Sequence, residues 1–99
     1  AGETEDKSRP WKERKQATID YLKQADTDAR ILALGDKLSN LRSTARDYLL
    51  MGDQVFERFN MKEKRWKGWY YTSLLEGFWE LKQFPEYREF VRLCHMVFG

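Results

Sequence analysis

Apolar residues recur at steps of three and four between residues 31 and 49, and this spacing constrains the fold more than any other feature of the chain. The series is Ile31, Leu34, Leu38, Leu41, Ala45, Tyr48 and Leu49. On a helix that turns about 100° per residue, residues at these steps share one face. No segment of the sequence shows sustained two-residue alternation bounded by turn residues, so no sheet is predicted. We therefore expect an all-α chain, a bundle of about four helices.

The first two helices are delimited by capping residues. Proline suits the first turn of a helix, and the segment that follows Pro10 carries apolar residues at helical spacing to about residue 24. Residues 26–28 (Asp-Thr-Asp) are N-cap candidates for a second helix. That helix is expected to run to about Met51 and to end at Gly52.

The remaining helices follow a short helical turn at residues 54–60. A third long helix carries aromatic and apolar residues from Trp66 onward and is expected to continue to Phe84. It ends there because the residue before a proline is disfavoured in the helical region, and Pro85 follows. Pro85 opens the last helix. Residues 1–9 have no large apolar side chain and are predicted to be a flexible N-terminal segment.

Composition narrows the classes of function. A chain of 99 residues forms one domain at most, and its 18 basic and 16 acidic residues give a net charge of +2. Nothing in this balance demands a polyanionic partner, so we do not expect nucleic acid to be the ligand. The single cysteine, Cys94, cannot form an internal disulfide, and no apolar run reaches the length of a membrane span. The sequence predicts a soluble cytoplasmic protein that does not enter membranes.

The second predicted helix has too many apolar sides for a surface helix. Asp36 and Asn40 lie opposite its core stripe, yet Leu32 and Ala33 flank them, so a cover is expected on both faces. One interpretation is that Asp36 is a metal ligand or an acid–base group and that Asn40 orients a substrate or water. The other is an exposed Asp and Asn on the solvent side of an ordinary helix, and the helical wheel alone favours this second interpretation.

The stretch "LGDKLSNLR" at residues 34–42 resembles the last metal-binding segment of HD-domain phosphohydrolases, most nearly the guanosine tetraphosphate (ppGpp) hydrolase branch. The family pattern is a small residue, Asp, Lys or Arg, Leu, any residue, Asn, an apolar residue and Arg, and residues 35–42 follow it without a gap. "WKERKQ" and "RILA" upstream extend the similarity. The resemblance implies that residues 10–99 are the C-terminal part of an HD-type helical domain.

The resemblance also implies roles for individual residues. Asp36 matches the final Asp that binds one divalent metal, manganese as a rule in the family, and is thereby the catalytic residue of this segment. Asn40 matches a residue that contacts the nucleotide. Tyr71 or Tyr70 corresponds to a tyrosine of the nucleotide pocket, and the register leaves both open. Lys37 and Arg42 could neutralise phosphate charge in the same way, or could be surface cations.

The chain lacks the other metal ligands of the family. Its only histidine, His95, follows Asp36, whereas the family's histidines precede the Asp, and no His-Asp pair occurs. One carboxylate cannot fix the geometry of a catalytic ion. We therefore expect this chain alone to be inactive and to bind no metal tightly, with Leu32 and Ala33 packing against N-terminal helices that it does not contain. The alternative is a non-catalytic all-α interaction module that binds a partner or a second copy through that apolar face.

Two further patterns are interpreted as structural. The run at residues 62–71 mixes cations with aromatic residues, which single-stranded nucleic-acid binding would use, but a charged helix surface beside a core stripe explains it as well. Lys64, Arg65 or Lys67 could add to phosphate binding, although no spacing singles one out. Cys94 and His95 point about 100° apart on a helix, so a core Cys beside a partly exposed His is expected rather than a metal pair.

Overall fold

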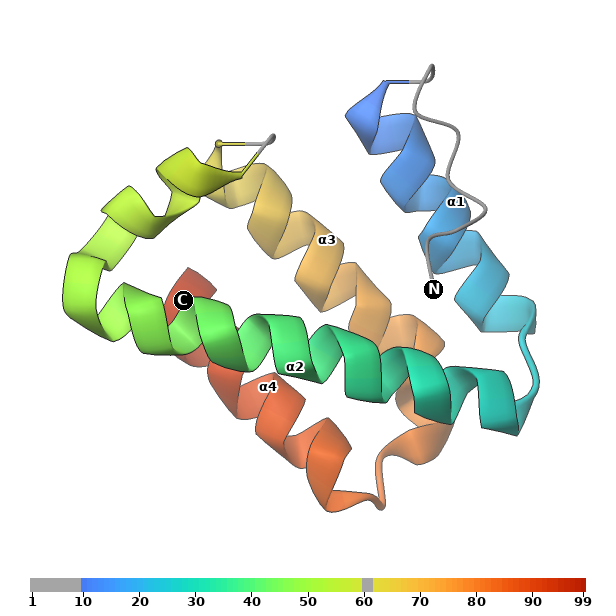
Figure 1. Ribbon diagram of the computed structural model, residues 1–99. Coiled ribbons are helices and arrows are strands. Elements are labelled where there is room, and N and C mark those ends of the chain that lie inside the picture. Colours follow the sequence, from blue (N-terminus) through green and yellow to red (C-terminus); the bar gives the residue numbers. More distant parts are fainter. Residues whose placement is uncertain (1–9, 60–61) are drawn as a thin grey trace.

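Four α-helices and two 3-10 helices make up the computed structural model, which describes residues 10–59 and 62–99 (Figure 1). Their order is α1 (Trp11–Gln24), α2 (Thr27–Met51), η1 (Gly52–Arg58), α3 (Lys64–Gly77), η2 (Trp79–Leu81) and α4 (Pro85–Phe98). The described residues contain no strand, so the all-α prediction is confirmed. The predicted flexible segment, residues 1–9, lies outside the described residues. None of the helices in the described part is long and apolar enough to cross a membrane.

The limits of α2 and α4 follow the predicted caps. The Asp26 side chain accepts a hydrogen bond from the Ala29 N–H at 2.8 Å, which satisfies a donor that the helix itself leaves unpaired. Gly52 ends α2 with φ of 64°, a left-handed conformation that glycine adopts without steric cost. Pro85 is in the first turn of α4, after an extended Phe84. These local signals were sufficient to delimit both helices.

The third helix ends earlier than predicted, at Gly77 rather than Phe84. After Gly77 the backbone tightens into η2, where the Leu81 N–H donates to the Phe78 carbonyl at 2.8 Å. Phe78 and Leu81 remain buried across this change. The three-residue step between them suits a 3-10 turn as well as an α-helix, so the apolar spacing concealed the break.

Gly77 lies where α3 approaches α1 closely. A Cβ added there would be 2.9 Å from the Leu22 Cβ, which is fixed to the α1 backbone and cannot rotate away. We expect Gly77→Ala to lower the free energy of unfolding by about 1–2 kcal/mol, as overpacking outweighs the better helix propensity of alanine. Gly35→Ala is the matched control: nothing lies within 4 Å of its added Cβ, so stability should rise by about 0.5–1 kcal/mol. Urea denaturation of both variants tests this. If Gly77→Ala leaves the free energy of unfolding unchanged, α1 is not held against α3 in solution.

The core-facing side of α2 differs from the predicted series at both ends, and at the C-terminal end Leu49 is 71% exposed. Leu34, Leu38, Leu41 and Ala45 are buried as predicted, but Ile31 is 44% exposed. Ile31 borders a cavity of 330 Å³ that Leu81 and Phe84 also line, and this cavity leaves it only partly covered.

The two residues that flank Asp36 also differ from the prediction. Ala33, expected to pack on helices outside this chain, is 5% exposed and belongs to the chain's own core. Leu32 is 76% exposed. The chain's own core therefore covers one of the two apolar sides predicted for α2, the side with Ala33, and leaves the side with Leu32 exposed.

Arg30 joins the end of α1 to α2 and η2. Its guanidinium donates to the Leu22 and Lys23 carbonyls at 2.9 and 2.8 Å, and to the Glu80 carboxylate at 2.8 Å. The last carbonyls of a helix have no partner within the helix, so a cation placed there is favourable. This contact fixes the turn between α1 and α2 and orients α1 along α3 (Figure 1).

Candidate functional site

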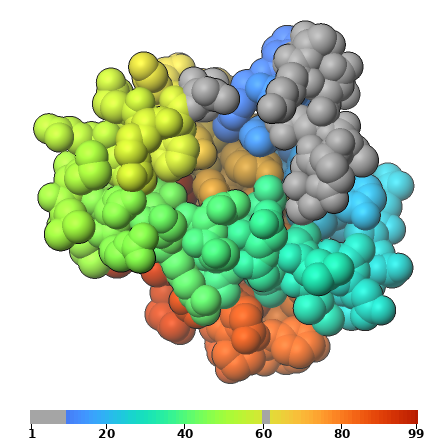
Figure 2. Space-filling view, viewed as in Figure 1, coloured from blue at the N-terminus to red at the C-terminus, as the bar shows by residue number. Residues whose placement is uncertain are grey.

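A pocket of 340 Å³ opens between α1, α2, η1 and α3. Figure 2 shows the surface hollowed there, with α3 visible at depth between α1, α2 and η1. Its described lining combines basic, aromatic and small polar side chains: Trp11, Lys15, Lys37, Asn40, Ser43, Thr44, Arg58, Phe59, Lys67, Tyr70 and Tyr71. No Asp or Glu is among these residues.

α2 contributes one polar face to the pocket. Lys37, Asn40 and Thr44 follow one another at steps of three and four, and Ser43 lies beside them. The buried Thr44 hydroxyl donates to the Asn40 carbonyl at 3.0 Å. The Thr44 hydroxyl therefore already donates its hydrogen to the α2 backbone. Asn40 lines the pocket one turn before it.

α3 supplies two tyrosines. Tyr70 and Tyr71 are 4% and 6% exposed, and their ring centroids are 5.5 Å apart in an edge-to-face arrangement. Burial raises the pKa of Tyr71 to about 12, with smaller contributions from Cys94 and Asp36. Its hydroxyl is therefore protonated at neutral pH and can donate a hydrogen bond. Both tyrosines line the pocket, so the two register alternatives of the sequence converge on the same site.

Four cations line the pocket, and three of them are lysines from three different helices. Lys67 Nζ lies 4.0 Å from the centroid of the Phe59 ring and 5.6 Å from that of Tyr71. Lys15 Nζ lies 5.1 Å from the Tyr70 centroid, and Lys37 Nζ 5.9 Å from it. Burial lowers the pKa of Lys67 to about 8, and the charges of Lys15 and Lys37 add to the effect. The fourth cation, Arg58, pairs with Asp47 at 2.8 Å.

Asp36 and Arg42 are not among the residues that line the pocket. Asp36 lies one turn before Asn40 on α2, its side chain is 53% exposed, and its Oδ2 is 3.8 Å from Lys37 Nζ. Arg42 donates two hydrogen bonds of 2.6 Å to the Glu89 carboxylate on α4. This bidentate pair raises the pKa of Arg42 and lowers that of Glu89. A phosphate contact by Arg42 stays a prediction that its position does not favour.

The residues beside the pocket do not make a metal site on their own. Within residues 10–59 and 62–99, no three His, Cys, Asp or Glu side chains are grouped so that they could hold an ion. A divalent metal at Asp36 would need further ligands from outside these residues. Asp36 as metal ligand and catalytic residue therefore stays a prediction from the family resemblance.

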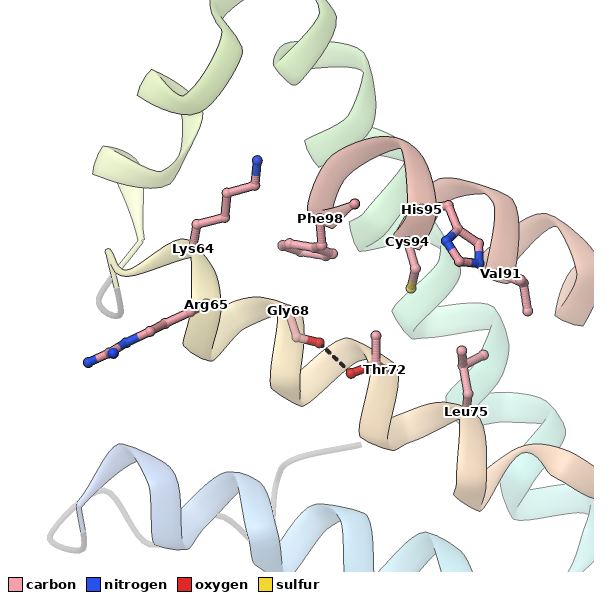
Figure 3. A pocket seen from close by; sticks show the side chains of 10 residues that line it. Lys64, Arg65, Gly68, Thr72, Leu75, Val91, Cys94, His95 and Phe98 are labelled. Carbon is pink, nitrogen blue, oxygen red and sulfur yellow. Dashed lines mark hydrogen bonds between the residues drawn. The ribbon is translucent and has the colours of Figure 1, made fainter.

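A second, larger cavity of 660 Å³ lies between α3 and α4 (Figure 3). Its centre is apolar, and the Cys94 sulfur points into it from α4. Burial raises the pKa of Cys94 to about 12, so the thiol is not a nucleophile at neutral pH. Lys64 at its edge pairs with Asp53 at 3.1 Å. Cys94 is buried and His95 is exposed, as expected from the sequence. The smaller, basic pocket is the better candidate site.

Comparisons of the chain with protein-family models, with curated proteins and with solved structures found no match. The interpretation of the site therefore depends on its geometry and on the residue pattern of α2. Sequence reasoning placed Lys37, Asn40 and the tyrosines in a common site but did not single out Lys15 or Lys67. Lys15 lies in the similar stretch "WKERKQ", which by itself assigns it no role, and no spacing distinguishes Lys67 from Lys64 and Arg65, because α1 and α3 come together only in the folded chain.

Proposed function

We propose that this chain is the C-terminal part of an HD-type, metal-dependent phosphohydrolase, and that its basic pocket binds a phosphorylated nucleotide, a ppGpp-like pyrophosphate among the candidates. One observation carries the proposal. Asn40, Tyr70 and Tyr71 line a single pocket together with Lys37 and further cations. The resemblance assigns Asn40 and one of the two tyrosines to the nucleotide, and it leaves Lys37 as either a phosphate contact or a surface cation. The resemblance expects residues of α2 and α3 to meet at one nucleotide pocket, and their shared lining of this pocket supports that expectation.

The lining matches the chemistry of such a ligand. The carboxamide of Asn40 can both donate and accept hydrogen bonds, as recognition of a base or a ribose requires. Aromatic side chains offer faces on which a base can stack. The lysines suit the phosphates, and the volume of 340 Å³ lies within the range of small-molecule sites.

The proposal assigns nucleotide binding, and no hydrolytic step, to this chain alone. Asp36 is the one carboxylate beside the pocket to which the family pattern assigns a metal, and it lies one turn from Asn40. The remaining ligands of a manganese ion would come from the N-terminal part of the parent domain. The role of the described residues is to bind and orient the nucleotide next to Asp36.

Isothermal titration of the 99-residue chain with guanosine tetraphosphate tests the proposal, with guanosine as the uncharged control. We expect saturable binding of the tetraphosphate and a loss of about tenfold in affinity for Asn40→Ala, because the substitution removes a hydrogen bond to the ligand. Arg42→Ala should leave the affinity unchanged, since its side chain is bound to Glu89 on α4. Binding of guanosine as tight as that of the tetraphosphate, or an Asn40→Ala variant that binds like the unaltered chain, would contradict the proposal.

The alternative function, a non-catalytic interaction module, is favoured by the exposed leucines of α2. Leu32, Leu49 and Leu50 are 76%, 71% and 82% exposed. Sedimentation velocity of the chain and of Leu32→Glu distinguishes the two functions. A dimer that dissociates in Leu32→Glu, together with no nucleotide binding, would favour the module; a monomer that binds nucleotide would exclude self-association as its purpose.

A further inference from the structure

We propose that the outer face of α2 binds the same face of a second copy of this chain, with the two helices antiparallel. The outer face is a stripe of six residues on the side of α2 away from the core: Leu32, Asp36, Ser39, Ser43, Arg46 and Leu50. On a helix that turns about 100° per residue, all of them lie within about 40° of one line. The inference goes beyond the proposed function, because the pairing requires neither a nucleotide nor a metal.

The stripe is open along its whole length. Every one of its residues is exposed, and the leucines at its two ends, Leu32 and Leu50, are 76% and 82% exposed. α2 crosses the front of the molecule in Figure 1, and its side chains form the surface there in Figure 2. A partner that covers both ends of the stripe would remove this apolar surface from water.

The order of residues along the stripe is complementary to itself when it is reversed. In an antiparallel pair centred at residue 41, residues equally far before and after that position face each other. The facing pairs are Leu32 with Leu50, Asp36 with Arg46, and Ser39 with Ser43. Because a two-fold symmetric interface forms each contact twice, this one register joins apolar residues at both ends and opposite charges on both sides of the centre.

The charges of Asp36 and Arg46 are paired only weakly within one copy. Asp36 Oδ2 lies 3.8 Å from Lys37 Nζ, and Arg46 Nε lies 3.8 Å from Asp47 Oδ1. The Asp36 and Arg46 side chains remain 53% and 74% exposed. Exposed pairs of this kind contribute little to stability. Between two copies, the same carboxylate and guanidinium would meet in a partly covered site, where a charge-assisted hydrogen bond is stronger.

The pattern favours the antiparallel orientation over the parallel one. A parallel pair in register would place Asp36 against Asp36 and Arg46 against Arg46, and like charges that face each other oppose association. In the antiparallel pair the centre holds Ser39 and Ser43, whose small side chains allow two helix axes to approach closely. Arg42, at the edge of the centre, is already bound to Glu89 at 2.6 Å and adds little repulsion there.

The pairing is expected to be weak. One helix face is a small interface, typical of transient complexes, so we expect the dimer at protein concentrations of about 0.1 mM and above. At the much lower concentrations of unfolding experiments the chain is then a monomer with Leu32 in water. Because Asp36 is also the residue to which the family pattern assigns a metal, the N-terminal helices of a parent domain would cover the same face. The two covers exclude each other.

Sedimentation velocity of the 99-residue chain at about 0.01 to 1 mM, without nucleotide or metal, tests the pairing. We expect a reversible dimer. Asp36→Arg and Arg46→Asp should each weaken association by at least about tenfold, because each places like charges opposite one another. The chain that carries both substitutions regains opposite charges in both pairs and should dimerise like the unaltered chain. Asp20→Arg, the same change at an exposed residue of α1, is the matched control and should leave association unchanged.

A second readout reports the register directly. Chains with Ser39→Cys and chains with Ser43→Cys are mixed and oxidised. The mixed disulfide dimer should form in preference to either like pair, because only the unlike positions lie at the same height along the two helices, as the short span of a disulfide requires. Cys94 is buried and does not compete.

Three results would overturn the pairing. The first is a monomer at every concentration. The second is a doubly substituted chain that associates as poorly as the single variants, with all of them folded by circular dichroism. The third is like disulfide pairs that are as abundant as the mixed pair. None of these results bears on the nucleotide, which is absent from the experiment, and a failure of guanosine tetraphosphate to bind would overturn the proposed function while the dimer stands.

Discussion

Leu34→Ala should lower the free energy of unfolding by about 2–5 kcal/mol, whereas Leu32→Ala should change it by less than about 0.5 kcal/mol. The two leucines are two residues apart on α2, but Leu34 is 3% exposed and Leu32 is 76% exposed. Removing Leu34 leaves a cavity in the main core, which Leu38 and Phe90 also form, whereas removing Leu32 removes side chain that is already in water. Urea denaturation followed by circular dichroism measures both values.

The pair of variants also tests whether the outer side of α2 is covered in solution. If Leu32→Ala costs as much as Leu34→Ala, and its cost grows with protein concentration, a second copy must bury Leu32. That result would favour the interaction module over the nucleotide-binding function. A small and concentration-independent cost would agree with a face that is open in this chain.

Lys67→Met should raise the free energy of unfolding at pH 7 by about 3–4 kcal/mol. The pKa of Lys67 is lowered from 10.5 to about 8 in the folded chain, chiefly by burial and then by Lys15 and Lys37. Each unit of such a shift corresponds to about 1.4 kcal/mol, which the folded chain loses whenever Lys67 is charged. Below about pH 8 Lys67 is charged in both states, so the full cost is present at pH 7.

The same shift gives the unaltered chain an unusual dependence of stability on pH. Between about pH 8 and 10.5 the folded chain releases the Lys67 proton while the unfolded chain keeps it, so stability rises with pH there. Burial raises the pKa of Cys94 from 9 to about 12 and that of Tyr71 from 10 to about 12, and these shifts act in the opposite direction above pH 9. We therefore expect maximal stability near pH 9, with a gain of about 1 kcal/mol over pH 7.

Urea titrations at pH 7, 8, 9 and 10 measure this profile. Lys67→Met should abolish the rise between pH 7 and 9, and Lys82→Met should retain it, because Lys82 lies on the surface away from the three pocket lysines. If the stability of the unaltered chain does not change between pH 7 and 9, Lys67 is solvated. Its pKa would then no longer support a pocket in which three lysines lie close together. A rise that persists in Lys67→Met would assign the effect to another group.

The fold could be predicted where local chemistry decides it. The caps at Asp26, Gly52 and Pro85 act within one turn, so their residue types are informative without knowledge of the rest of the chain. α3 instead ends at Gly77, where it lies against Leu22, a residue distant in sequence. The exposure of Ile31 likewise depends on where Leu81 and Phe84 lie. Such tertiary effects are not contained in the spacing of apolar residues.

The candidate site was predictable to the extent that it lies on one helix. Lys37 and Asn40 share a face of α2, and helical geometry alone brings them together. The same geometry separates Arg42 from Asn40, because residues two apart on a helix point about 160° away from each other. Lys15 and Lys67 belong to other helices, so only packing reveals that they join this site.

The guanidinium of Arg30 ties the C-terminal end of α1 to the start of α2 and to Glu80. Trp11 and Lys15 are on the same helix, two to three turns toward its N-terminal end. The C-terminal end of α1 is thus held by Arg30, and Trp11 and Lys15 toward its N-terminal end form part of the pocket wall. Arg30 therefore helps to hold one wall of the pocket although it is not among the residues that line it.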